Sequence, residues 1–211
     1  MSRALAAAER LPLDAYATPA ELALAICRRV RGVSGRLPAI TTILEPSAGQ
    51  GPFVRAAREV WPEAHITAVD LDERTKPLLA AAGANLVLVE DWPQLARKLA
   101  NEQTEDAVDT RLVIGNPPYR EAEEHIAAAL DWLRAGDQLV FLLRLNFLGS
   151  RHRMELLKAS PLVWVAPVIP RPSFTPDGGT DATEYGVYAW RKGRNGGRRL
   201  APPIVWRGGK R

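Results

Sequence analysis

The alternation of short apolar runs with amphipathic stretches constrains the fold of this chain more than any other feature. The apolar runs are typical of buried strands, and the stretches between them have the periodicity of helices. The expected strands are residues 39–44, 65–69, 85–89, 111–114, 138–145, 161–169 and 184–190. The expected helices are residues 17–31, 52–61, 72–82, 94–100, 121–134 and 150–159. This order predicts a doubly wound α/β sheet with helices on both faces, in which ligands bind beyond the carboxyl ends of the strands.

Size and composition favour a single globular domain. The 211 residues, 46% of them hydrophobic, are ample for one core. No apolar run reaches the roughly 20 residues of a membrane span. Residues 1–10 lack the apolar segment of a secretory signal, and the single cysteine, Cys27, permits no intramolecular disulfide. These features predict a cytoplasmic protein without a membrane partner.

Basic side chains are concentrated at the end of the chain. Residues 191–211 carry lysines and arginines but no acidic residue, and the net charge of the whole chain is +4. This tail is compatible with a solvated end or with a segment that contacts phosphates. Residues 204–206 within it are a candidate for a short last strand. The main domain is therefore expected over residues 1–190.

A glycine-rich turn follows the first expected strand, in the segment Glu45-Pro46-Ser47-Ala48-Gly49-Gln50-Gly51-Pro52. Gly49 and Gly51 allow a tight turn and a close approach of the backbone to a ligand. Val54 occupies the position of the third glycine of a dinucleotide fingerprint, which argues against a classical dinucleotide site. Taken alone, the segment is also compatible with an ordinary strand–helix turn.

Acidic residues end the second and third expected strands. Asp70 lies about 20 residues beyond the glycines, where a carboxylate can accept hydrogen bonds from ribose hydroxyls. Asp91 can accept from an adenine amino group, and the neighbouring Trp92 is a candidate to cover the adenine ring. Either acid alone is compatible with a helix N-cap. Together with the glycine turn, the two acids predict a pocket for an adenosine ligand without a pyrophosphate.

The segment Asn116-Pro117-Pro118-Tyr119 follows the fourth expected strand and is the most specific motif in the chain. The prolines fix a rigid extended turn, and their carbonyls are expected to be free acceptors beside the Asn116 side-chain oxygen. Acceptors that face an amino group localise its lone pair for attack on a methyl sulfonium, without a covalent enzyme intermediate. Tyr119 offers a flat face to a planar target. The motif therefore predicts methylation of an amine whose lone pair is delocalised.

These motifs resemble those of class I S-adenosylmethionine-dependent amino-methyltransferases, and specifically those of γ-order DNA N6-adenine methyltransferases. The segment Tyr16-Ala17-Thr18-Pro19 resembles motif X of that family, and residues 44–53 resemble motif I. Asp70 and Asp91 fall at motifs II and III.

The second half of the chain continues the resemblance. Residues 116–119 match motif IV, which is specific for amino methylation. The segment Arg171-Pro172-Ser173-Phe174 resembles motif VIII, whose aromatic residue helps to hold a flipped base. The resemblance spans roughly residues 16–190.

The resemblance implies the Rossmann-like class I methyltransferase fold, with a mostly parallel seven-stranded sheet, and a catalytic domain over residues 1–190. It implies S-adenosylmethionine as the cofactor and double-stranded DNA, with base flipping, as the partner. The implied cofactor-binding residues are Tyr16, Thr18, Glu45, Ser47, Gly49, Gly51, Asp70, Asp91, Trp92 and Asn116. The implied catalytic residues are Asn116, Pro117, Pro118, Tyr119 and Phe174.

Several alternatives stay open, because a long target-recognition domain after motif VIII, usual in the family, is not found in this sequence. They are methylation of glutamine side chains in proteins, of adenine in RNA or of cytosine N4 in DNA, and a catalytically silent DNA-binding relative. Cytosine-N4 enzymes usually carry Ser or Thr at the position of Asn116. His65, His125 and His152 show no metal-ligand spacing, so no metal site is expected. The pattern leaves the oligomeric state open.

Overall fold

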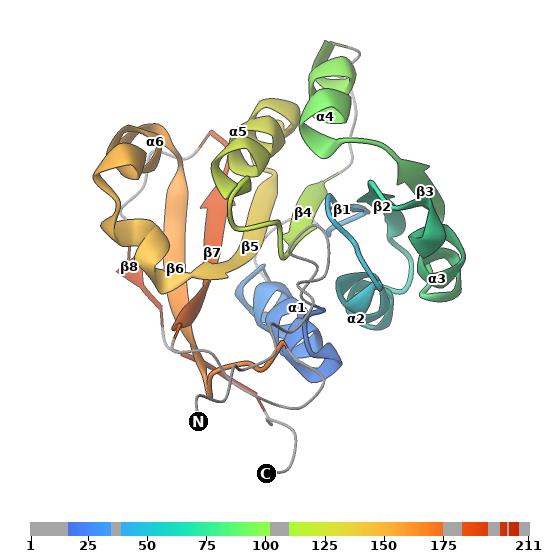
Figure 1. The fold of residues 1–211 in the computed structure, drawn as a ribbon, viewed down its shortest axis with the longest axis horizontal. Helices are drawn as coiled ribbons and strands as arrows, with labels where there is room; N and C mark the ends of the chain where they lie inside the picture. The colour runs from blue at the N-terminus through green and yellow to red at the C-terminus, as the bar shows by residue number, and fades with distance from the viewer. Residues whose placement is uncertain are drawn as a thin grey trace, which may run out of the picture.

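A mostly parallel sheet runs through the molecule, with helices on both of its faces (Figure 1). The computed structural model describes residues 17–34, 39–101, 110–174, 183–193, 199–201 and 203–206. Tyr16, the loop of residues 176–181 and most of the basic tail lie outside these described residues.

The order of the strands is that of a doubly wound sheet. Along the sheet the strands run β3-β2-β1-β4-β5-β7-β6. The pairs from β3 to β5 are parallel, whereas β7 is antiparallel to both β5 and β6. The bounds are β1 Thr42–Glu45, β2 His65–Asp70, β3 Leu86–Val89, β4 Arg111–Gly115, β5 Gln138–Arg144, β6 Leu162–Ile169 and β7 Tyr185–Arg191. The expected mostly parallel, seven-stranded fold is confirmed.

Two further strands of two residues each extend the sheet beyond the seven. These are β8, Arg199–Leu200, and β9, Ile204–Val205, and both pair in parallel with β6. The last short strand expected at residues 204–206 is therefore present. Part of the C-terminal segment is thus tied to the sheet.

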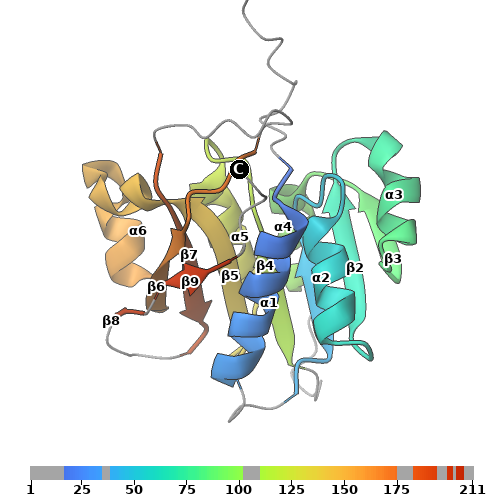
Figure 2. The same ribbon diagram turned by 90° about the horizontal axis from the view of Figure 1, so that it is seen from below.

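The helices form one layer on each face of the sheet. Side chains of α1, α2 and α3 pack in one hydrophobic core, and those of α4, α5 and α6 pack in the other. Figure 2 shows α1 and α2 together on the same face. The bounds are α1 Ala20–Ser34, α2 Pro52–Val60, α3 Lys76–Ala81, α4 Trp92–Asn101, α5 Ala122–Trp132 and α6 Met154–Ala159. No described helix combines the length and the apolar character needed to span a membrane.

Side chains along each central strand pack alternately in the two cores. In β1, Ile43 belongs to the core under α1 and α2, whereas Leu44 belongs to the core under α4 and α5. In β4, Leu112 and Val113 divide in the same way. Successive residues of a strand point to opposite faces, so a sheet covered on both sides needs continuous apolar runs. This requirement explains why the apolar runs of the sequence mark the strands.

Proline decides where one of the expected helices begins. The sequence predicts a single helix over residues 72–82, but the α-helix starts only at Lys76 and has Pro77 in its first turn. Proline fits there because no intrahelical partner is required of its missing N–H. The residues before it form the 3₁₀ turn η1, Glu73–Thr75, in which the Asp72 side chain accepts from Arg74 N–H. Two further 3₁₀ turns, η2 Leu145–Gly149 and η3 Arg151–Arg153, follow β5.

The chain reverses its direction of winding between β1 and β4. From β1 it winds outward through β2 and β3, and it then returns to β4 on the other side of β1. Side chains at the carboxyl ends of these two strands border the crevice where ligands bind in such sheets. Glu45 ends β1, and Asn116 directly follows β4. The fold therefore brings the two central motifs of the sequence to the same place.

Candidate active site

The turn after β1 contains two glycines with positive φ angles. Gly49 has a φ of 51° and Gly51 a φ of 76°, which other residues adopt only with strain. A Cβ atom at Gly51 would lie 3.0 Å from Leu79 Cδ2, so this glycine also permits close packing of α2 on α3. A Cβ atom at Gly49 would find no neighbouring atom within 4 Å among the described residues. The turn therefore requires glycine and leaves open space beside Gly49.

Asp70, at the end of β2, is hydrogen-bonded to the same turn. Its Oδ2 accepts from the Gly49 backbone N–H at 2.7 Å, and its Oδ1 accepts from the Asp72 backbone N–H at 2.9 Å. Each carboxylate oxygen has a second acceptor position, so ribose hydroxyls can still donate to it. Asp70 thus fixes the glycine turn from the neighbouring strand, which sequence reasoning did not anticipate.

Glu45 is a buried acid that forms no ion pair with any residue that the structure describes. It is 2% exposed, and its Oε2 atom has no hydrogen-bond partner among the described residues. Burial, and to a lesser degree the nearby Asp70, raises the pKa of Glu45 well above its usual 4.5, against the backbone N–H of Val54. A buried carboxylate is stable when a cation accompanies it. The ammonium and sulfonium groups of S-adenosylmethionine would supply that charge, so the residue fits this cofactor.

Replacing Glu45 by glutamine is expected to weaken cofactor binding and to abolish its pH dependence. In the wild type, affinity should rise with pH up to the raised pKa of Glu45, which lies well above 4.5, because Glu45 must lose its proton before it can pair with a cation. The lost charge-assisted hydrogen bond is worth about 1.5–3 kcal/mol. Isothermal calorimetry across pH measures both effects, with the exposed Glu59→Gln as the control. Equal pH profiles of the wild type and Glu45→Gln would contradict this role.

The free energy of unfolding of the unliganded protein should depend on pH in the opposite direction to cofactor affinity. Since the pKa of Glu45 is raised in the folded protein, the unliganded wild type loses stability as the pH rises and the buried group ionises. Glu45→Gln removes that ionisation, so the variant should be more stable than the wild type at high pH in urea unfolding.

Ser47, in the glycine turn, contacts a histidine that sequence reasoning missed. The Ser47 hydroxyl lies 3.0 Å from His125 Nε2 and 2.8 Å from the Pro46 carbonyl oxygen. His125 Nδ1 lies 3.1 Å from the Glu121 carbonyl, which can only accept, so Nδ1 carries the proton and Nε2 is an acceptor. The single Ser47 hydroxyl proton can go either to Nε2 or to the Pro46 carbonyl. Burial lowers the pKa of His125, which favours this neutral form. The pair connects the turn to α5 across 78 positions of sequence, a separation that no local pattern reveals.

Asp91 and Trp92 take structural positions at the start of α4. Asp91 Oδ1 accepts from Gln94 N–H at 3.0 Å, which is the N-cap alternative. Trp92 is only 2% exposed and meets Trp132 edge-on with ring centroids 6.0 Å apart. Its indole N–H points to the His125 carbonyl at 3.4 Å. The expectation that the Trp92 ring covers an adenine is corrected, because helix α4 begins at Trp92 and turns the ring into the core.

Asn116 is oriented by a residue near the start of the described chain. Its Nδ2 atom donates to Thr18 Oγ1 at 3.2 Å. Its Oδ1 atom is buried and has no partner among the described residues. Thr18 lies two residues before helix α1, which begins at Ala20. Its hydroxyl oxygen is the acceptor for Asn116. The amide nitrogen is thus occupied, and the amide oxygen is left as an unused buried acceptor.

One of the two proline carbonyls already accepts a hydrogen bond from the backbone. The Pro118 carbonyl accepts from Glu121 N–H at 3.0 Å, in the turn that leads into α5. The expectation that both are free is therefore wrong for Pro118, because starting a helix directly after the motif requires this turn. The Pro117 carbonyl accepts from none of the described residues. Asn116 Oδ1 and the Pro117 carbonyl are the pair of acceptors that remains.

Three aromatic rings lie next to one another beside this motif. The centroids of Tyr119 and Tyr185 are 5.9 Å apart, and those of Tyr185 and Phe174 are 4.9 Å apart. The guanidinium of Arg144 lies 4.8 Å from the centre of the Tyr119 ring. Burial raises the pKa of the Tyr119 phenol, so this ring stays neutral. Tyr185 belongs to β7, and Arg144, which was not anticipated, ends β5.

The described residues hold no group of three or more histidine, cysteine or acidic side chains that could bind a metal ion. Cys27 is fully buried in α1, and burial raises the pKa of its thiol, so it is no nucleophile. Neither a metal site nor a reactive cysteine is therefore an alternative to the site at the strand ends among the described residues.

Comparison with known proteins relates part of the sequence to a methyltransferase. No protein-family profile matches the chain. The type II methyltransferase M.CvrRI of Paramecium bursaria Chlorella virus XZ-6E is 34% identical over 79 residues, which make up 37% of this chain. The match spans only 18% of the length of that viral protein.

Solved structures share the fold at low sequence identity. A protein of Agrobacterium tumefaciens named as a predicted O-methyltransferase matches 90% of this chain and 87% of its own, with a TM-score of 0.59 and 19% identity. A Listeria monocytogenes protein named as a class I S-adenosylmethionine-dependent methyltransferase matches 89% and 65%, with a TM-score of 0.64 and 14% identity. The chain therefore has the class I methyltransferase fold. The resemblance inferred from the motifs is confirmed at this level, and the cofactor it implies is the one named for the Listeria protein.

Proposed function

We propose that this chain is a methyltransferase that transfers a methyl group from S-adenosylmethionine to the exocyclic N6 amino group of adenine in DNA. The observation that carries the proposal is the buried Asn116 Oδ1 beside the Pro117 carbonyl, two acceptors that have no hydrogen-bond partner among the described residues. These two acceptors match the two hydrogens of an amino group. The partial relative is named as a type II methyltransferase, and the motif resemblance to γ-order DNA enzymes supports DNA as the substrate.

The cofactor is proposed to lie beyond the ends of β1 and β2. Glu45 would pair with the positive charge of the cofactor, and Asp70 would bind its ribose. The cofactor would lie against the backbone at Gly49, where a Cβ atom would meet no neighbouring atom within 4 Å among the described residues. A Cβ atom at Gly115 would lie 3.5 Å from Glu45 Cγ, so the end of β4 packs directly against Glu45. Cofactor and target would thus be neighbours. Ser47 and Gly51 hold the turn, and Thr18 contributes through Asn116.

The residues of this chain position the target amine and change the distribution of its lone pair. When bound, S-adenosylmethionine supplies an electrophilic methyl group. Asn116 Oδ1 and the Pro117 carbonyl each accept a hydrogen bond from the amino group. These two hydrogen bonds draw the nitrogen lone pair out of the ring and direct it away from both acceptors. Thr18 holds the Asn116 amide in the required orientation. These groups are in place before the reaction, so reorganisation costs little.

Assaying label transfer from methyl-labelled S-adenosylmethionine into DNA, RNA and protein tests this function. We expect label in DNA, and N6-methyldeoxyadenosine as the only labelled nucleoside after digestion. Label in protein, recovered as N5-methylglutamine, would replace the proposal by the glutamine alternative. Label in RNA or at cytosine N4 would correct the substrate while leaving the amine chemistry intact.

Phe174→Ala is expected to weaken binding and methylation of duplex DNA without changing cofactor affinity. The proposal needs a base outside the helix, and unstacking it costs a few kcal/mol. An aromatic face returns about 1–3 kcal/mol by stacking on the base. Phe174 is half-buried, and the centre of its ring lies 4.9 Å from that of Tyr185. A duplex with 2-aminopurine at the target should brighten less with the variant than with the wild type.

The control is Phe174→Leu, which keeps an apolar contact with Tyr185 but removes the ring. If both variants give wild-type fluorescence and rates, Phe174 only packs against Tyr185 and does not hold the base.

A further inference from the structure

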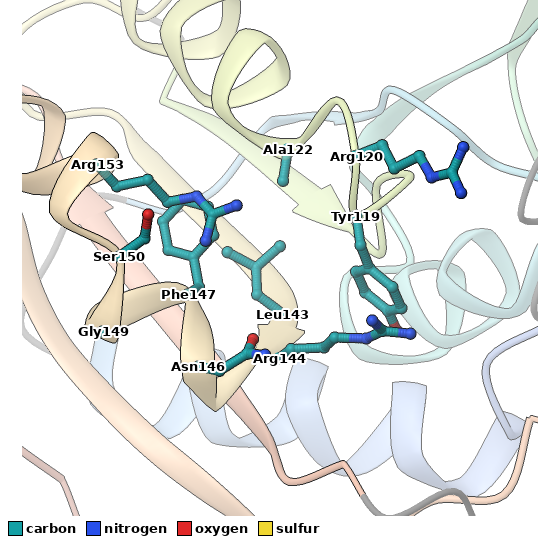
Figure 3. A pocket seen from close by; sticks show the side chains of 10 residues that line it. All are labelled: Tyr119, Arg120, Ala122, Leu143, Arg144, Asn146, Phe147, Gly149, Ser150 and Arg153. Atoms are coloured by element: carbon teal, nitrogen blue, oxygen red, sulfur yellow. The ribbon is translucent and has the colours of Figure 1, made fainter.

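A cleft with arginines along its lining opens beside the Asn-Pro-Pro-Tyr motif. It has a volume of about 670 Å³ and lies between the start of α5, the end of β5 and the 3₁₀ turns η2 and η3 (Figure 3). Tyr119 borders it, so the cleft adjoins the site of the target amine. It also contains Arg120, Arg144 and Arg153, and none of these was part of the motifs read from the sequence.

Arginines and aromatic rings alternate along this cleft. The Arg153 guanidinium lies 4.6 Å from the centre of the Phe147 ring, and that of Arg144 lies 4.8 Å from the centre of the Tyr119 ring. Figure 3 shows these two arginines on either side of Leu143, with Arg120 extending beyond Tyr119. A guanidinium placed over a ring can still direct N–H groups away from it, toward an oxyanion.

The charge of this lining is incompletely neutralised. Arg153 Nε donates to Glu123 Oε1 at 2.7 Å, so one of the three charges is paired. Arg144 forms no ion pair with any described acid, and its Nε atom is buried without a hydrogen-bond partner in the described part of the chain. Arg120 is exposed. No described acid offsets the Arg144 charge, and an anion in the cleft would supply the missing counter-charge to the guanidinium.

We propose that this cleft binds the phosphodiester backbone of the strand that carries the target base, with Arg144 as its principal phosphate ligand. This inference rests on the proposed function and deepens it. Arginine matches phosphate oxygens with two parallel hydrogen bonds, and phosphate contacts fix the register of a nucleic acid without reading its sequence. A backbone held along Arg153, Arg144 and Arg120 would pass Tyr119. A base turned out of that strand would then reach Asn116.

The salt dependence of DNA binding tests this proposal. Fluorescence anisotropy of a labelled duplex gives the affinity at several salt concentrations for the wild type, Arg120→Gln, Arg144→Gln and the double variant. Each lost phosphate contact should flatten the slope of log K against log salt by about 0.9. Arg144→Lys should keep the wild-type slope, because it retains the charge. The slope counts released counterions, so a lost stacking contact with the neutral Tyr119 would not change it.

The matched control is Arg28→Gln, which removes the same charge from an exposed arginine of α1 that pairs with Glu59 on α2. Its slope should equal that of the wild type. Methyl transfer to DNA is measured on the same proteins, so that two failures can be told apart. If the wild type methylates DNA but the Arg120 and Arg144 variants keep its slope, the phosphate site is refuted and the proposed function stands. If the wild type neither binds nor methylates nucleic acid, the proposed function fails and this inference falls with it.

Discussion

Replacing Asn116 by alanine is expected to lower the rate of methyl transfer about 10²–10³-fold, the usual cost of removing one preorganised transition-state hydrogen bond. The variant should still fold and bind S-adenosylmethionine. The reason is that the lost Oδ1 atom has no partner among the described residues, and that the lost Nδ2 atom makes one hydrogen bond, to Thr18. Single-turnover methylation of DNA measures the rate, and calorimetry measures the cofactor affinity. A variant with near wild-type turnover would refute the two-acceptor mechanism.

The matched variant changes the orientation of Asn116 and keeps its side chain. Thr18→Val removes the Oγ1 atom that accepts from Asn116 Nδ2 at 3.2 Å and leaves the volume nearly unchanged. Its effect should be smaller than that of Asn116→Ala and should be seen in kcat. Thr18→Ser restores the hydroxyl and should restore the rate. If Thr18→Val affects only cofactor affinity, Thr18 contacts the cofactor and does not position Asn116.

Replacing Trp92 by alanine is expected to lower the free energy of unfolding by about 3–5 kcal/mol, the range for large-to-small changes in a core. Trp92 is 2% exposed and packs edge-on against Trp132, so the variant loses a large apolar contact and an aromatic pair. Urea unfolding of the wild type and the variant measures the loss.

Cofactor affinity distinguishes this core role from the one expected from the sequence. Trp92→Phe keeps an aromatic ring but loses the N–H that faces the His125 carbonyl, so it should cost much less stability than Trp92→Ala. Both variants should bind S-adenosylmethionine as the wild type does wherever they are folded. A stable Trp92→Ala protein with weak cofactor binding would return Trp92 to the adenosine pocket.

Sequence reasoning was most successful where the physical cause is local. Apolar runs in the strands, Pro52 at the start of α2 and the positive φ angles of Gly49 and Gly51 all follow from neighbouring residues and from backbone sterics. Winding order then places the ends of β1 and β4 side by side. The positions of Glu45 and Asn116 at strand ends are therefore enough to predict that they border one crevice.

The interpretation of Trp92 changed, because this side chain has two local uses. That of Asp91 stays a prediction, since the cap uses only its Oδ1 atom. Asp91 suits both an adenine contact and a helix N-cap, and Trp92 suits both a ligand face and a core position. Local pattern cannot choose between such uses, because the choice depends on where the helix begins and on what packs against it. In the structure, Trp92 packs in the core with residues of α4 and α5.

The sequence by itself determined the class of fold, the order of the motifs and the residues that end the central strands, because hydrophobic periodicity and turn chemistry act over a few positions. The tertiary structure alone decided which acceptors stay free. Thr18 occupies the Asn116 amide nitrogen across 98 positions, and the turn into α5 occupies the Pro118 carbonyl. It also decided that β7 lies between β5 and β6 and brings Tyr185 between Tyr119 and Phe174. Pairings over such separations arise from packing of the whole sheet, which no short segment encodes.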